Sequence, residues 1–124
     1  MNGKKNSPAR SESTYRQLEE VLGCKWSVSV LQAVAEGILR PGALERHIPG
    51  ISTKVLSERL RKLTGYGLLA KHPYAEIPPR TEYFLTPIGL KLVAIISQIE
   101  LLDHEIKNSQ QNQPAADYRS QPGT

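Results

Sequence analysis

Apolar residues recur at a helical spacing through the first half of the chain, and glycines or prolines separate the repeats. A first helix is predicted over about residues 15–22 and ends before Gly23. A second is predicted over 25–36, where one apolar stripe contains Trp26. Pro41 suits the first turn of a third, short helix, because its missing N–H would have no partner there in any case.

A fourth helix is predicted from Ser52, as its N-cap, to about Tyr66, directly after a tight turn at Pro49-Gly50. Each residue advances an α-helix by about 100°, which places its three leucines on one face. These are Leu56, Leu60 and Leu63. The opposite face is polar and mostly cationic, and it carries Lys54, Ser57, Glu58, Arg61 and Lys62.

Two segments with strand-like composition follow, at Leu68–His72 and Thr81–Leu85. Between them lies Pro73–Arg80, in which the prolines prevent full strand pairing, so we expect an extended hairpin loop. Thr86-Pro87 then predicts the N-cap and first turn of a long last helix that reaches about Ile106.

The predicted order is helix, helix, helix-turn-helix, hairpin and helix. This is a mainly α-helical fold with a small β-hairpin wing, the winged helix-turn-helix arrangement. We expect the folded domain over residues 13–106. Residues 1–12 and 107–124 are predicted to be a disordered arm and a disordered tail, because they contain too few large apolar side chains to offset the entropy of ordering.

The last helix carries more apolar surface than one buried side of a terminal helix requires. Its start should pack on the winged domain, while its far end should meet a second copy of the chain. We therefore expect a dimer formed through the terminal helices. The candidate dimerisation residues are Ile95, Ile99, Leu102 and Ile106.

Composition narrows the class of protein. Sixteen Lys and Arg against twelve Asp and Glu give a net charge of +4, which favours polyanionic partners. The single cysteine, Cys24, excludes an internal disulfide framework and a multi-cysteine zinc site. No apolar run is long enough to suggest a membrane span, and no secretory signal is recognisable, so we expect a soluble cytoplasmic protein.

The polar face of the fourth predicted helix suits the major groove of DNA, and its N-terminus, at Ser52 and Thr53, suits a phosphate. In the hairpin loop, Arg80 beside two prolines could reach the minor groove or the DNA backbone. Two alternatives stay open. The helix pair could be a corner with a solvated charged face, and Arg80 could simply pair with Glu76 or Glu82 at the surface.

Four segments resemble the HxlR-type branch of the MarR-like winged-helix regulators. They are Gly23–Trp26, Pro49–Arg61, Gly67–Leu69 and Pro78–Gly89. The resemblance covers about Tyr15 to Asp103. It implies homodimeric, promoter-binding repressors or activators, with Ser52–Lys62 as the recognition helix and Arg80 in the wing.

The chain departs from this family at its cysteine. Several redox-sensing members carry a cysteine at the start of the first helix, where this chain has Ser13, Thr14 and Tyr15. Cys24 occupies a different position. It could be a redox sensor if exposed near Lys25, or a small buried apolar residue between two helices.

The three histidines lie on three different predicted elements, so neither a metal site nor a cofactor is expected. No catalytic motif is recognisable, which argues against a small hydrolase or another enzyme. The sequence thus predicts a homodimeric transcriptional regulator that binds a specific palindromic operator in double-stranded DNA, with a small-molecule or redox effector left open. The alternative is a winged-helix module for protein interactions.

Overall fold

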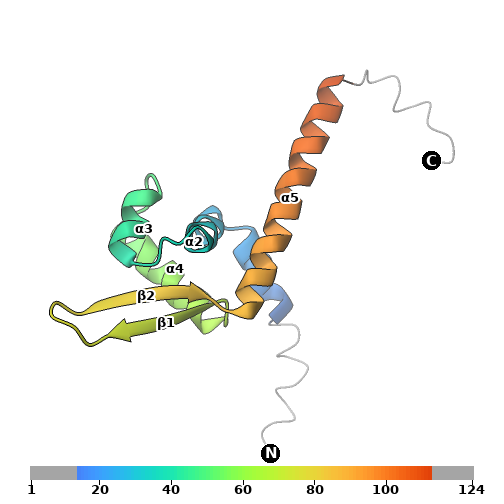
Figure 1. Cartoon of the computed structure of the whole chain (residues 1–124). Coiled ribbons are helices and arrows are strands. Elements are labelled where there is room, and N and C mark those ends of the chain that lie inside the picture. Colours follow the sequence, from blue (N-terminus) through green and yellow to red (C-terminus); the bar gives the residue numbers. More distant parts are fainter. Residues whose placement is uncertain (1–13, 113–124) are drawn as a thin grey trace, which may run out of the picture. The chain divides into compact units, whose positions relative to one another are not determined.

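The computed structural model describes residues 14–112. A helix over residues 14–22 comes first and is followed by six further elements (Figure 1). These are α2 (Lys25–Ala35), α3 (Pro41–His47), α4 (Thr53–Gly65), β1 (Leu69–Tyr74), β2 (Arg80–Leu85) and α5 (Pro87–Asn112). The chain divides into two compact units, one through Val93 and one from Ala94, so the boundary falls within the sequence of α5. The predicted order of elements and the mainly helical fold with a two-stranded hairpin are confirmed.

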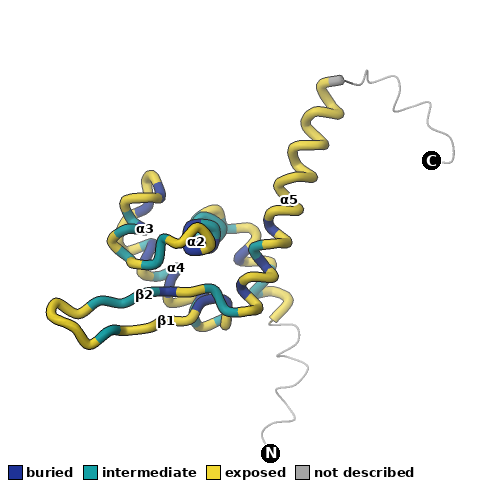
Figure 2. The backbone as a smooth tube through the Cα atoms, in the orientation of Figure 1, coloured by how far each residue is buried: buried dark blue, intermediate teal, exposed yellow. Residues whose placement is uncertain are grey.

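The core of the first unit lies where α2, α3 and α4 meet the hairpin. Each helix contributes buried apolar residues, and the dark blue segments of the tube in Figure 2 mark buried positions. The buried side chains include Val30, Leu31, Val34, Leu44, Leu56, Leu60, Leu63, Leu68, Leu69 and Tyr83. The leucine face predicted for the fourth helix is therefore the face that packs inward, and its polar face is left outside.

Strands β1 and β2 pair antiparallel, from Leu69 opposite Leu85 to Tyr74 opposite Arg80. The hairpin is longer than predicted, because Pro73 and Arg80 belong to the paired strands and not to the loop. Proline has no N–H to donate, so it is tolerated in an edge strand where its nitrogen faces away from the neighbouring strand. Both strands of a two-stranded sheet are edge strands, so Pro73 can belong to β1. The Tyr83 N–H donates to the carbonyl of Leu39 at 2.9 Å, which fixes the hairpin to the segment before α3.

The start of α5 is locked against the turn that precedes β1. The Thr86 hydroxyl accepts from the Gly89 N–H at 3.0 Å and donates to the carbonyl of Gly67 at 2.6 Å. Gly89 has no room for a side chain, since a Cβ there would lie 2.1 Å from the carbonyl oxygen of Leu68. The predicted Thr86-Pro87 cap is therefore correct, and the glycine behind it is required by close packing.

Helix α5 continues past the predicted end near Ile106 and reaches Asn112. Its last turns contain pairs at the i, i+4 spacing that supports a helix, Asp103 with Lys107 and His104 with Asn108. The first residues of the segment predicted as a disordered tail are therefore helical. The rest of that tail and the predicted N-terminal arm lie outside the described residues.

Candidate DNA-binding site

The turn between α3 and α4 has the geometry that its sequence predicts. Gly50 adopts a φ of 84°, a left-handed conformation that favours glycine. Ser52 is the N-cap of α4, and its hydroxyl accepts from the Val55 N–H at 3.1 Å. The Thr53 hydroxyl donates to Glu45 at 2.6 Å, so it ties α4 to α3. Ser52 and Thr53 were predicted to hold a phosphate, and the hydroxyl group of each already forms a hydrogen bond within the protein.

The outer face of α4 presents the side chains that the sequence assigned to it. Lys54, Ser57 and Arg61 are exposed, while Glu58 is partly exposed. Among the described residues, neither Lys54 nor Arg61 forms an ion pair. Their charges are therefore available to an anionic partner.

Lys62 differs from the other cations of α4. It forms an ion pair with Glu20, which belongs to the helix over residues 14–22, and the Tyr66 hydroxyl donates to the same carboxylate at 2.7 Å. The hydrogen bonds from Lys62 and Tyr66 lower the pKa of Glu20 below its ordinary value. This side of α4 is thus engaged within the protein, a contact between residues far apart in sequence that the helical pattern could not reveal.

Arg80 is also engaged. Its guanidinium pairs with Glu76 and, at 3.4 Å, with Glu82, and it lies 3.9 Å from the centre of the Tyr74 ring. The surface pairing that the sequence left open is therefore present in the protein without DNA. A phosphate could reach this guanidinium only by competing with two carboxylates.

One cation close to α4 was not among the predicted site residues. Lys71 in β1 lines a groove together with Ser57 and Arg61 of α4. Lys71 stands opposite the buried Tyr83 and so shares its face, but the register of the strands and their packing against α4 reveal this, and the sequence pattern alone does not.

Cys24 is the N-cap residue of α2 and is partly buried. Arg59 donates to its sulfur at 3.7 Å. Burial raises the pKa of the Cys24 thiol, but interactions with the Ser27 hydroxyl, with nearby backbone N–H groups and with Arg59 outweigh it, so the pKa lies below its ordinary value. The surroundings therefore favour the thiolate more than a purely apolar site would.

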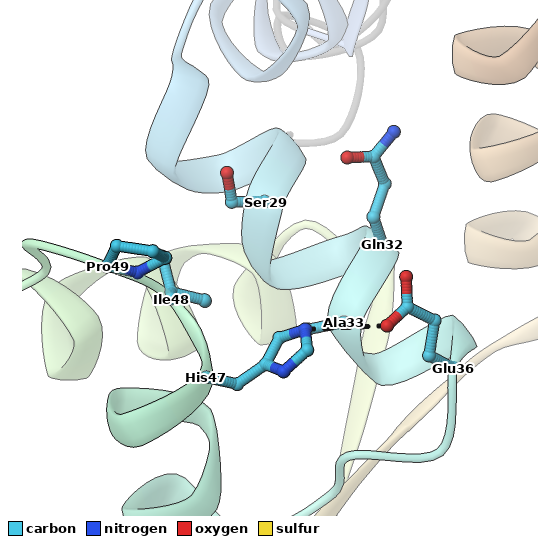
Figure 3. Close-up of a pocket in the computed structure, with 7 residues that line it drawn as sticks. All are labelled: Ser29, Gln32, Ala33, Glu36, His47, Ile48 and Pro49. Carbon is cyan, nitrogen blue, oxygen red and sulfur yellow. Dashed lines mark ion pairs between the residues drawn. The ribbon is translucent and has the colours of Figure 1, made fainter.

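A small pocket of about 160 Å³ lies on another side of the same unit, between α2 and the end of α3 (Figure 3). His47 points across it to Glu36, with 3.4 Å between the imidazole and the carboxylate. Neither residue belongs to the outer face of α4. In the described part of the chain, no group of His, Cys, Asp or Glu is arranged to hold a metal ion.

The predicted dimerisation residues share one stripe on α5. Ile95, Ile99, Leu102 and Ile106 are 50%, 47%, 54% and 47% exposed. From residue 97 onward, every described side chain of this helix is exposed, as the yellow tube in Figure 2 shows. The described residues therefore leave this stripe about half exposed.

A family model described as HxlR-like helix-turn-helix matches residues 21–111. The match includes α4, the hairpin and most of α5. The chain belongs to this family. It is thus related to proteins described as HTH-type transcriptional regulators, and the resemblance found in the sequence is confirmed.

Curated relatives of this chain have been identified in several organisms. An uncharacterised HTH-type transcriptional regulator of Synechocystis, sll1512, is 42% identical over 77 residues, which are 62% of this chain and 57% of that protein. YkvN of Bacillus subtilis, also an uncharacterised HTH-type regulator, is 37% identical over 81 residues, which are 65% of this chain and 69% of that protein. The match thus spans little more than half of the Synechocystis protein.

Solved structures share the winged-helix fold. A MarR-family transcriptional regulator from Enterococcus faecalis superposes with a TM-score of 0.73 and 28% identity, covering 82% of this chain and 93% of that one. The redox regulator HypR in its reduced form gives a TM-score of 0.66 and 26% identity, covering 76% and 93% of the two chains. Within residues 14–112, no helix has the length and apolar character that crossing a bilayer requires.

Proposed function

We propose that this regulator acts as a homodimer that binds a palindromic operator in double-stranded DNA. The observation that carries the proposal is the outer face of α4, on which Lys54 and Arg61 are exposed and have no ion-pair partner among the described residues. A helix with such a face fits the major groove, and its N-terminal half reaches the base edges.

The residues of α4 contact different parts of the DNA. Arg61 reads a base edge, because its planar fork of donors matches the two acceptors of guanine. Lys54 and Ser57 contact the backbone or neighbouring bases, and Glu58 accepts from cytosine. At the N-terminus of α4, the backbone N–H groups of Ser52 and Thr53 donate to a phosphate, which the positive end of the helix also attracts. Lys62 and Arg80 contribute to DNA binding only if phosphate displaces their carboxylate partners.

The homodimer forms through the α5 stripe of Ile95, Ile99, Leu102 and Ile106. Two copies that meet across a two-fold axis cover these half-exposed side chains, and the same symmetry matches a palindromic site. The two α4 helices then enter major grooves about one helical turn, or about 34 Å, apart.

The alternative proposal is a module that pairs with other proteins and does not bind DNA specifically. Lys54 and Arg61, which have no ion-pair partner among the described residues, favour DNA, because unpaired cations on one helix face create a positive potential that attracts a polyanion.

Selection of genomic fragments that the purified protein retains tests the proposal. We expect an enriched sequence with two-fold symmetry, bound with an affinity that falls steeply as salt concentration rises, because phosphate contacts release counterions. Enrichment of no common sequence, or affinity that is indifferent to salt, would favour the protein-interaction module instead.

A further inference from the structure

The two faces of the β hairpin carry different charges. Residues directly opposite each other in an antiparallel pair share a face, and successive residues alternate. The pair of Tyr74 and Arg80 therefore lies on one face, and the pair of Lys71 and Tyr83 lies on the other. Because Tyr83 is buried, the Lys71 face is the one turned toward the helices.

A groove of about 490 Å³ lies on this inner side, between α4 and the hairpin. We call it the α4–wing groove. Leu60 and Tyr83, both buried, line it as apolar surface. Its polar lining comes from Ser57, Arg61 and Thr64 of α4 and from Lys71 of β1.

No described residue balances the positive charges of the groove. Neither Arg61 nor Lys71 forms an ion pair in the described part of the chain, and no carboxylate lines the groove. On the other face, Arg80 is paired with Glu76 and Glu82. Among the described residues, the cation of the wing without an ion pair is therefore Lys71, on the inner face and next to the outer face of α4.

We propose that the α4–wing groove is a binding site for a backbone phosphate of DNA, held by the Lys71 ammonium and the Ser57 hydroxyl beside Arg61. The inference rests on the proposed function and adds a contact to it. An ammonium is a compact point charge that suits a phosphate, whereas the fork of Arg61 suits the adjacent base edge. A phosphate fixed between helix and wing would set the position of α4 along the major groove.

The substitution Lys71→Gln tests this site, with Lys91→Gln as the matched control, because Lys91 is an exposed lysine on α5. Binding to the selected operator is measured by fluorescence anisotropy across a range of salt concentrations. A dimer in which both chains carry Lys71→Gln loses two phosphate contacts, so the slope of log affinity against log salt should fall in magnitude by about 2. Lys71→Arg should keep most of the slope, and Lys91→Gln should keep all of it.

The outcomes separate this inference from the proposed function. If the unmodified protein binds with a steep salt slope and Lys71→Gln leaves both slope and affinity unchanged, the phosphate site is wrong and the regulator still binds DNA. If the unmodified protein shows no salt-dependent binding, the proposed function itself fails. Equal melting temperatures for both glutamine variants confirm that the lysine acts on DNA and not on folding.

Acetylation of lysines by a water-soluble reagent provides a second measurement on the intact protein. Operator DNA should protect Lys71 and leave Lys91 reactive. Inorganic phosphate at the same phosphate concentration should protect neither, because only DNA also engages α4. Equal protection of Lys71 by free phosphate would overturn the assignment to the DNA backbone.

Discussion

The part of the chain through Val93 and the distal part of α5 use apolar residues in opposite ways. In the first, the leucines of α2, α3 and α4 are almost completely buried. In the second, four residues of similar size on one stripe stay about half exposed. The first part has a core of its own, whereas the second has an apolar stripe that the described residues leave half exposed. The difference agrees with the proposal that one part recognises DNA and the other mediates assembly.

The largest effect is expected when charges replace the exposed stripe. In the double variant Ile99→Glu and Leu102→Glu, association would bury like charges against each other, so the dimer should dissociate. Affinity for the operator should fall about 100-fold or more, because two half-sites can no longer be bound at once. Sedimentation and anisotropy measure the two effects.

The matched control places the same charges on the opposite side of α5, in Ser97→Glu with His104→Glu. Both residues are exposed, and helical geometry puts them about half a turn away from Ile99 and Leu102. This variant should remain dimeric. A dimer that survives the first variant would place the interface elsewhere.

A substitution in the buried core tests the other half of the comparison. Leu63→Ala removes a side chain that is 1% exposed, and it should lower the free energy of unfolding by about 2–5 kcal/mol. Leu101→Ala, in a leucine of α5 that is 57% exposed, should lower it far less. Urea denaturation at one protein concentration measures both, and equal losses would contradict the division into a buried core and an open helix.

A smaller and more local effect is expected at Arg61. Arg61→Ala should cost about 1–3 kcal/mol in operator binding and relax the preference at one base pair of each half-site. Stability should not change, since Arg61 is exposed and has no ion pair among the described residues. Arg16→Ala, at an exposed arginine of the first helix, serves as the control in the same anisotropy assay. An unchanged base preference would show that Arg61 does not read sequence.

The smallest effect concerns the thiol of Cys24. Because its pKa is lowered, a larger fraction is thiolate at any given pH, so the midpoint of alkylation by iodoacetamide should lie below that of a free cysteine. Ser27→Ala should move the midpoint upward, since the Ser27 hydroxyl is the strongest of the interactions that lower this pKa. Mass spectrometry after timed alkylation at several pH values follows the reaction. A midpoint above that of a free cysteine would indicate that burial dominates.

Local signals in the sequence were sufficient for most of the fold. The Ser52 cap, the Gly50 turn and the leucine face of α4 depend on neighbours within a few residues, and each was predictable. The end of α5 was harder to predict. Its last turns contain few apolar residues, and side-chain pairs at the i, i+4 spacing support the helix there instead. Pro73 could join a strand because its hairpin has no third strand among the described residues.

The sequence was sufficient to predict which residues lie on the surface of the candidate site, but not which of them form ion pairs. The outer face of α4 follows from helical periodicity alone. The partner of Lys62 does not, because Glu20 lies 42 residues away in sequence and approaches only in the folded chain. Lys71 was missed for a similar reason, since its place beside Arg61 depends on how the hairpin packs against α4. Ion pairs over such separations require the tertiary structure.

The stoichiometry of the protein on its operator tests the central claim most directly. Sedimentation equilibrium with a duplex that contains the full selected site, and with a duplex that contains one half-site, gives the number of chains bound to each. The account predicts two chains on the full site, with an affinity far above that for the half-site. A single chain that binds the full site with undiminished affinity would contradict a homodimer on a palindromic operator.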